Sequence, residues 1–397
     1  KVRLERLGYF KGGEGETPQV PGMDDQIDVN FTVEEQPSGS ISGTLAYSQG
    51  YGLIIGGNYQ QSNLQGSGNS LNVGLSLSQF QKSVNFNYFD PYFTMDGISR
   101  GYNVFLRRLD YDARNIARYS TDAAGVGVNF GLPISETQRI NFGVLAEYTE
   151  ITEGYYAAQE ISEFIEINGS TSVNLKANVS WSRSTLNRGI FADRGSSQSI
   201  AAEISVPGSE LQFYKFIYNG ERYFPITNSW TLRLRTELGY GGGYGDTPGL
   251  PFYEHFYGGG FGSIRGFENS TLGPRSTPPL DENGNPIYFR DRDGDPFGGN
   301  LLLEATAELI FPMPFVDDNR QFRPAIFVDA GNVFNTNCPT VSVNCFDFDS
   351  ENMRYSVGIG VSWLSGMGPL SFSFAKPFQT QPFDEKEMFQ FELGRTF

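Results

Sequence analysis

The chain has 397 residues, among them 48 Gly, 34 Phe and 21 Tyr, and its mean hydropathy is -0.34. No window approaches the ~20 consecutive apolar residues that a membrane-spanning helix requires, so helical membrane proteins are excluded. Acidic residues outnumber basic ones 45 to 29, which argues against a nucleic-acid partner because phosphate binding requires a basic patch.

Residues 1–36 differ from the rest of the chain. Val2 to Phe10 mix charged and apolar residues at helical spacing, a Gly- and Pro-rich loop follows, and residues 26–35 alternate strictly. A helix, a loop and a strand in this order predict a fragment of a small α+β module. Because Lys1 does not open a signal peptide, we expect either a mature protein or a chain that was cut upstream.

From Pro37 onward the sequence is Gly-rich and alternates between apolar and polar residues. About sixteen segments have this period of two, an even number, as single-chain bacterial barrels require. They lie near 38–48, 51–60, 68–78, 82–90, 98–110, 121–132, 138–152, 173–183, 197–206, 211–221, 229–243, 299–311, 324–334, 352–364, 369–376 and 387–397. The prediction is an all-β transmembrane barrel of antiparallel strands over residues 37–397.

The connections between these segments alternate in length. Short ones that carry Pro or Gly, such as 131–135, alternate with long polar ones, such as 153–172 and above all 244–298. In outer-membrane barrels the short turns face the periplasm and the long loops face the exterior. This parity places the N-terminal module and Phe397 on the periplasmic side of a bacterial outer membrane.

Several charged residues fall within the predicted strands. A charge on the lipid face costs ~2–4 kcal/mol at the membrane midplane, so Glu304, Glu308 and Arg354 are expected to point into the lumen. The lumen is therefore expected to be polar, and its charged side chains need partners there.

The connection 244–298 contains the run Phe261-Gly-Ser-Ile-Arg-Gly-Phe267. Glycine lets a backbone pack closely, and arginine offers carboxylates a planar fork of donors. An Arg-Gly pair alone is also consistent with a simple turn. The segment Ile264, Arg265, Gly266, Phe267 resembles the [V/I]RGF motif of the BamA/TamA superfamily of outer-membrane assembly factors.

This resemblance extends over nearly the whole chain. The terminal aromatic strand and the strand count fit that superfamily, Phe372-Ser-Phe-Ala-Lys-Pro-Phe378 is similar to its FSxAxPF stretch, and residues 29–37 are similar to the end of a POTRA domain. It implies that residues 1–36 are the C-terminal fragment of a periplasmic POTRA domain. It also implies that the loop 244–298 folds into the lumen, where Arg265 pairs with Glu308 and Asp329.

The first and last strands must meet to close the barrel. Both contain glycine, which weakens a strand, so a short seam is expected. The residues assigned to this seam are Gly39, Ser40, Ile41, Gly43, Leu45, Phe391, Leu393, Gly394 and Phe397. The resemblance implies that the seam opens sideways and pairs with the strand of a client protein. Alternatively, these glycines serve only curvature and tight packing.

The function that the resemblance implies is the folding and insertion of β-barrel proteins into the outer membrane, without a cofactor. The implied partners are nascent β-barrel proteins, outer-membrane lipids and accessory lipoproteins bound mainly by upstream POTRA repeats. A TamA-like factor, a two-partner secretion transporter and a general diffusion porin are the alternatives, and steady conductance through an open pore would support the porin.

The remaining candidate residues do not form an enzyme site. Cys338 and Cys345 lie close together in a polar stretch and predict a disulfide, with two free thiols as the alternative. His255 is the only histidine, which leaves no triad and no multi-histidine metal site. The run Asp281-Glu-Asn-Gly-Asn285 resembles a calcium loop in residue type but lacks the distal glutamate of an EF-hand. We therefore expect no metal and no enzyme activity.

Overall fold

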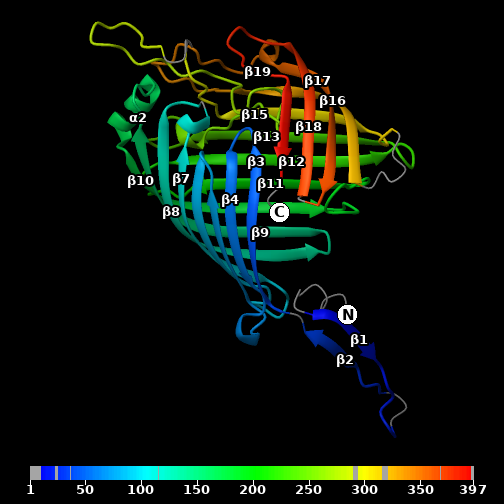
Figure 1. The fold of residues 1–397 in the computed structure, drawn as a ribbon. Coiled ribbons are helices and arrows are strands. Elements are labelled where there is room, and N and C mark those ends of the chain that lie inside the picture. The colour runs from blue at the N-terminus through cyan, green and yellow to red at the C-terminus, as the bar shows by residue number, and fades with distance from the viewer. Residues whose placement is uncertain are drawn as a thin grey trace.

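The computed structural model describes residues 10–22, 26–35, 37–114, 116–288, 294–314, 321–366 and 368–394. Sixteen antiparallel strands close into a barrel in which each strand pairs with the next along the chain and β20 returns to β3 (Figure 1). The all-β barrel predicted from the period of two is thereby confirmed.

The wall strands follow the predicted segments closely. They are β3 (Gly39–Ser48), β4 (Gly52–Gln61), β5 (Ser70–Leu77), β6 (Gln81–Asp90), β7 (Ser99–Asp110), β8 (Tyr119–Ser135), β9 (Gln138–Glu153), β10 (Thr171–Ser184), β11 (Gly195–Ser205), β12 (Phe213–Pro225), β13 (Thr231–Gly243), β15 (Leu301–Ile310), β16 (Phe322–Phe334), β17 (Arg354–Ser365), β18 (Gly368–Gln379) and β20 (Phe389–Leu393).

Side chains alternate between the two faces of the wall. On β17, Val357 and Ile359 are 42% and 60% exposed on the outer face, whereas Arg354 and Ser356 are fully buried on the inner face. The exposed apolar face suits lipid, and the inner face is polar, as a barrel with lipid outside requires.

Two boundaries differ from the prediction. Residues 131–135 are not a connection, because β8 continues to Ser135 with a register shift between Pro133 and Ser135. The last segment is not one strand over 387–397 either. It is divided into β19 (Lys386–Glu387), which pairs with β14 (Gly266–Phe267) of the long loop, and β20, which pairs with the wall. Phe397 lies outside the described residues.

The N-terminal part forms a two-stranded hairpin that projects from one end of the barrel (Figure 1). It consists of β1 (Phe10–Glu16) and β2 (Asn30–Glu35). The strand predicted over 26–35 is present in its second half, but part of the predicted loop is a strand, because β1 supplies the backbone partner of β2. The helix expected from Val2 to Phe10 falls on residues outside the described ranges, except that Phe10 begins β1.

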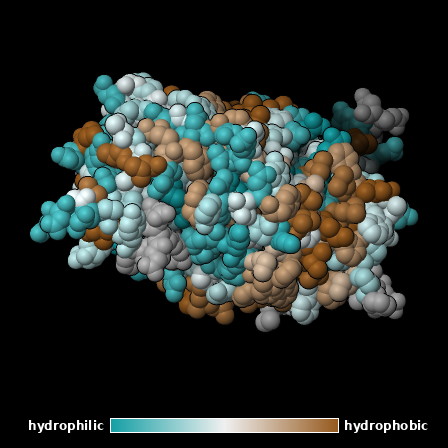
Figure 2. Space-filling model, turned by 90° about the horizontal axis from the view of Figure 1, so that it is seen from above, coloured by the Kyte–Doolittle hydropathy of each residue, from teal (hydrophilic) through white to brown (hydrophobic). Residues whose placement is uncertain are grey.

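The long connections gather at the opposite end of the barrel. They carry α2 (Gln159–Asn168) and the short 3-10 turns η2 (Asp112–Arg114), η3 (Phe252–Glu254) and η5 (Ser350–Asn352), while η1 (Leu64–Gly66) lies in a connection at the hairpin end. Figure 2 looks onto this end and shows hydrophilic side chains over much of its middle. In the described part of the chain, no helix is long and apolar enough to cross a membrane.

Candidate functional site: the lumenal loop and the barrel seam

Arg265, in the loop between β13 and β15, binds the inner wall of the barrel. Its Nε and Nη2 donate to the two carboxylate oxygens of Asp329 on β16, each at 2.8 Å, and its Nη1 donates to Glu308 Oε1 on β15 at 2.7 Å. Its backbone N–H also donates to Asp329 Oδ2 at 3.1 Å. The structure thus brings together the three charged residues whose pairing the family resemblance implied.

The Glu308 carboxylate is shared with a second arginine. Arg233 on β13 donates from Nη1 to Glu308 Oε2 at 2.8 Å and from Nε to Glu221 Oε1 at 2.6 Å. The five charges therefore alternate in sign along the inner wall, from Asp329 through Arg265, Glu308 and Arg233 to Glu221. Such alternation offsets the cost of removing each charge from water.

Phe327 forms the floor beneath Arg265. The guanidinium carbon lies 3.3 Å from the centre of the Phe327 ring, a cation–π contact, and Phe327 is 1% exposed. The ring has room because β17 carries glycine opposite it: a Cβ on Gly358 would lie 2.5 Å from Phe327 Cζ. Phe327 and Gly358 therefore set the position of the Arg265 side chain.

The rest of the motif is held by the last strand. Gly266 has φ +90°, a conformation that favours glycine, and a Cβ there would lie 3.2 Å from both Ala375 Cβ and Pro377 Cδ of β18. Gln390 of β20 is 1% exposed; its Oε1 accepts from Gly266 N at 3.3 Å and its Nε2 donates to Phe267 O at 2.7 Å. Ile264, Phe267 and Leu272 form a small buried apolar cluster beside these contacts.

The part of the loop at residues 250–258, here called the upper arm, has its own charged anchor. Glu254 in η3 accepts from Lys176 Nζ on β10 at 2.8 Å and from Lys215 Nζ on β12 at 2.9 Å. Burial alone would raise the pKa of the Glu254 carboxyl, but the two ammonium groups outweigh it and hold the pKa well below its usual range. Glu254 therefore stays ionised at any physiological pH.

His255 follows Glu254 and is set against the loop itself. Its Nδ1 lies 3.0 Å from Phe297 O, and the Phe297 ring stands edge-on to the imidazole. Burial lowers the pKa of His255 to about 4, since the charged form would lose its hydration there. The imidazole is consequently neutral at pH 7.

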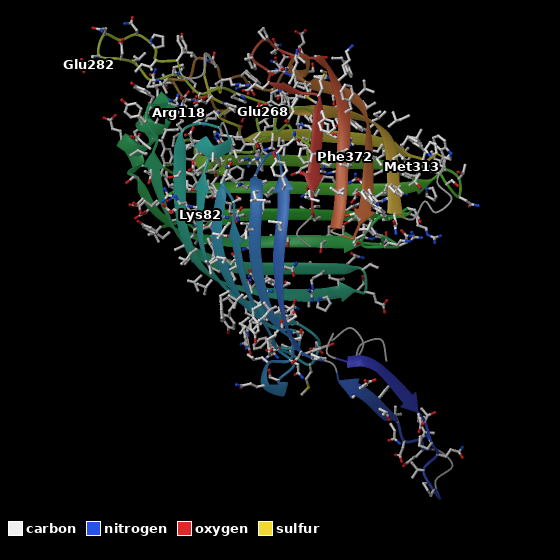
Figure 3. The ribbon with its side chains drawn as sticks, viewed as in Figure 1. Lys82, Arg118, Glu268, Glu282, Met313 and Phe372 are labelled. Atoms are coloured by element: carbon white, nitrogen blue, oxygen red, sulfur yellow. A yellow bond between two sulfur atoms is a disulfide. The ribbon has the colours of Figure 1, made fainter. Side chains whose placement is uncertain are left out.

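Above these anchors the loop covers the end of the barrel. Figure 3 shows Arg118 near the top of the barrel, where its Nε donates to the buried Asp295 at 3.2 Å, and Glu282 at the tip of the part that projects beyond it. The neighbouring Asp281 carboxylate accepts from the backbone N–H of Asn283 and Asn285, both at 2.8 Å. The segment that resembled a calcium loop is thus a turn closed by its own hydrogen bonds, and the described residues include no cluster of ligands for a metal.

The seam between β3 and β20 is short. Among the described residues, which end at Gly394, only Tyr47 with Leu393 and Ser48 with Glu392 are paired, whereas β3 and β4 share ten residue pairs. The Tyr47 and Phe391 rings stack with centroids 5.1 Å apart next to these pairs. As far as the structure describes them, the first and last strands are therefore joined by two residue pairs and one ring contact, in addition to contacts of the turn after β3.

The structure places the predicted seam residues unequally. Phe391 and Leu393 contact β3. Gly394 also lies against Leu45 and Ala46 of β3, but its backbone leaves the strand conformation with φ +71°. The segment from Gly39 to Gly43 pairs with β4 but with no residue of β20 among those described, and Ile41 is 85% exposed. Up to Gly394, the last residue described, the seam thus occupies only the end of β3 near Ser48.

The predicted disulfide between Cys338 and Cys345 is confirmed, with a Cα–Cα distance of 5.8 Å. It lies in the connection between β16 and β17, on the covered end of the barrel. From the same connection, Ser342 Oγ donates to Glu160 Oε1 of α2 at 2.9 Å, and Thr277 of the long loop donates to that oxygen at 2.6 Å. Glu160 thereby joins three connections into one cover.

Four of these positioning residues were not predicted from the sequence: Arg233, Phe327, Gln390 and Glu254. Phe327 carries a usable signal, because it shares the inner face of its strand with Asp329 and an aromatic there is unusual in a polar lumen. Gln390 likewise shares the inward parity of the last strand. Nothing in the local pattern marks Glu254, whose partners lie 78 and 39 residues away.

A family model for the Omp85 superfamily domain matches residues 63–397. The chain belongs to the Omp85 superfamily. It is 36% identical over its whole length to outer membrane protein assembly factor BamA of Neisseria meningitidis serogroup B, and covers 52% of that protein. Its identity to the BamA of Nitratidesulfovibrio vulgaris is 24%, again over the whole chain and 46% of the relative. The family expected from the Arg265 motif is thus confirmed.

Solved structures agree with this Omp85 assignment. BamA from Haemophilus ducreyi lacking POTRA domains 1–3 superposes with a TM-score of 0.86 at 31% identity, covering 99% of this chain and 76% of that one. CdiB from Acinetobacter baumannii, at 13% identity and a TM-score of 0.60, covers 98% of this chain and 66% of its own, and shares the fold alone. The chain is an outer-membrane β-barrel, and it spans about half the length of the curated relatives it matches.

Proposed function

We propose that this chain is the membrane part of a factor that folds β-barrel proteins and inserts them into the bacterial outer membrane. The observation that carries the proposal is the seam, where the described residues of β3 and β20 form two pairs while those of β18 and β20 form five. A wall joined so weakly at one place is the part of the barrel that opens at the lowest cost in hydrogen bonds.

Opening the seam would offer a client a template. Between Gly39 and Gly43, β3 already has no β20 partner among the described residues, so its outward backbone groups form a strand edge. An unpaired edge binds an extended segment by β-augmentation, with affinity from backbone hydrogen bonds and little demand on sequence. The client would add its own strands in turn and leave when its barrel closes.

This activity needs no catalytic residue or cofactor. A β-barrel buries its backbone polar groups only when every strand is paired, so an unfinished client is unstable in lipid and gains free energy by completing its sheet. The factor would lower the barrier by supplying the first pairing partner. We infer that nascent outer-membrane proteins and the lipids beside the seam are the partners of this chain.

The N-terminal hairpin supports a periplasmic assignment for residues 1–36 as the end of a POTRA domain. Ile27, Val29, Phe31 and Val33 lie on one face of it and are 37–58% exposed, as expected of a strand whose covering elements lie elsewhere in the protein. Accessory lipoproteins would bind mainly to upstream repeats of this kind.

A general diffusion porin is the less supported alternative. Porins keep a water-filled lumen, whereas here a loop anchored through Arg265 and Glu254 occupies it. A TamA-like factor and a two-partner secretion transporter share the barrel type, and they differ from the proposed function in the client they would handle.

The proposal is tested in liposomes that contain the chain joined to its natural upstream sequence. An unfolded outer-membrane protein is added, and its folding is followed by the mobility of the unheated band. The proposed function predicts faster folding than in liposomes without the factor or with an unrelated closed barrel. Equal folding rates together with steady ion conductance would favour the porin instead.

A further inference from the structure

The turn after β3 places a side-chain amide in the seam. Gln49 Oε1 accepts from the backbone N–H of Phe391 at 2.9 Å, and Gln49 Nε2 lies 3.4 Å from Phe389 O. A carboxamide carries the same donor and acceptor as a peptide group. Gln49 therefore extends the ladder beyond Ser48 and Glu392 without adding a strand residue.

The same amide reaches the top of the last strand. Gln49 Nε2 donates to Glu387 Oε1 at 2.7 Å, the shortest of its three contacts. The other oxygen, Glu387 Oε2, accepts from Gln390 Nε2 at 3.3 Å. One carboxylate thus joins the end of the first strand to a buried glutamine of the last strand.

Gln390 in turn holds the loop motif. As described above, it binds Gly266 N and Phe267 O, and the backbones of Gly266 and Phe267 pair with Glu387 and Lys386. The turn also packs directly on the loop, because a Cβ on Gly50 would lie 2.6 Å from Asn269 Cγ. The loop and the seam therefore share the same few hydrogen-bonding groups.

We propose that Gln49, Glu387 and Gln390 form a latch that closes the seam only while the Arg265 loop is seated. If the loop left the wall, Gln390 and Glu387 would lose their partners at Gly266 and Phe267. The Glu387 backbone would then no longer be held by pairing with the loop, and its carboxylate would no longer be fixed within reach of the Gln49 amide. Seating of the loop and closure of the seam then depend on each other. Only the purpose of the latch rests on the proposed function, because the coupling between loop seating and seam closure is a property of the barrel without a client.

The test measures amide hydrogen exchange in the purified protein, with no client present. Gln49→Leu removes the amide at nearly constant size, and Gln79→Leu in the next turn on the same side is the matched control, because Gln79 is exposed. Hydrogen bonds to a charged group contribute enough that their loss should speed exchange at 391–394 by about 10- to 100-fold. The latch predicts a rise of similar size in the loop at 264–267, which Gln49 does not touch.

Two further variants make the result decisive. Gln49→Glu is close in shape, places a second carboxylate beside Glu387, and should loosen both segments if Gln49→Leu does not fold. In the double variant of Gln49→Leu with Arg265→Ala, the effects on the loop should be less than additive. Faster exchange confined to 391–394, or additive effects, would overturn the latch, while a failure to fold clients would bear only on the proposed function.

Discussion

The guanidinium of Arg265 meets the carboxylate of Asp329 in two parallel hydrogen bonds of 2.8 Å, and Asp329 is fully buried. This geometry is the strong bidentate form of an ion pair. Because the arginine belongs to a loop and the aspartate to the wall, this pair fixes the loop inside the barrel.

Removing the arginine should therefore destabilise the barrel. Arg265→Ala leaves Asp329 with the backbone N–H of residue 265 but without the guanidinium, and leaves one oxygen of Glu308 unpaired, which should lower the free energy of unfolding by ~3–5 kcal/mol. Arg265→Lys should lose less, since it keeps the charge but not the fork. Urea unfolding in detergent micelles measures both.

The matched control for this loss is an exposed ion pair. Arg108 and Asp122 are 3.2 Å apart, with side chains 49% and 42% exposed, so Arg108→Ala should cost no more than ~1 kcal/mol. Equal losses for Arg265→Ala and Arg108→Ala would contradict the anchor.

A glycine on the wall should matter through the ring that it accommodates. In Gly358→Ala the new methyl would contact Phe327 Cζ and the backbone oxygen of Phe374, so the ring under Arg265 must move. We expect a loss of ~1–3 kcal/mol from overpacking, together with faster amide exchange at 264–267. Gly366→Ala has open space around its Cβ and should change neither quantity.

Acid should loosen the upper arm of the loop through His255. Its pKa is about 4 when the loop is folded, against 6.5 in an unfolded segment, so only the unfolded form takes up a proton between these values. The stability of the arm is thus unaffected above pH 6.5 and falls as the pH drops toward 4. Amide hydrogen-exchange protection of residues 250–258, corrected for the pH dependence of the intrinsic exchange rates, measures this fall in stability. The fall should be absent in His255→Gln. A fall of unchanged size in that variant would show that another group causes it.

Reduction of the disulfide should act locally. Opening the Cys338–Cys345 bond frees a short loop, which should cost that connection about 2–3 kcal/mol. The contacts of Val341 and Ser342 with Thr277 and Glu160 should weaken in consequence. Limited proteolysis with and without reductant measures the change in residues 335–349. If reduction instead lowers the melting temperature of the whole barrel, the cover is not a separate unit.

The strands of the barrel were predictable because lipid imposes a period of two on every one of them. On β17, for example, apolar Val357 and Ile359 alternate with Ser356 and Gly358, and no other packing competes with that pattern. The family motif likewise located Arg265, and charge burial in a lipid-facing wall located Glu308. These inferences rest on strong local rules.

The errors lie where remote segments decide the structure. The last strand divides at Met388 because the loop residues Gly266 and Phe267 pair with Lys386 and Glu387, and no local pattern contains that pairing. Gln49 follows the first strand in a turn, where a polar residue is expected anyway, so its contact with Phe391 N is invisible in the sequence. The strand at Phe10–Glu16 was missed because six of its seven residues are charged or glycine, which resembles a loop until β2 supplies a partner.

The seam is tested most directly by locking it. Ser48→Cys and Glu392→Cys lie opposite each other across the seam, within reach of a disulfide, in a protein that also carries Cys338→Ser and Cys345→Ser. The control places cysteines at Ser76 and Ser83, which face each other on β5 and β6 away from the seam.

Client folding is then followed in liposomes before and after reduction, with the chain joined to its natural upstream sequence. If the seam must open, the seam-locked protein should not speed client folding until it is reduced, while the control protein should be active throughout. Fast client folding by the locked, oxidised protein would contradict a working seam.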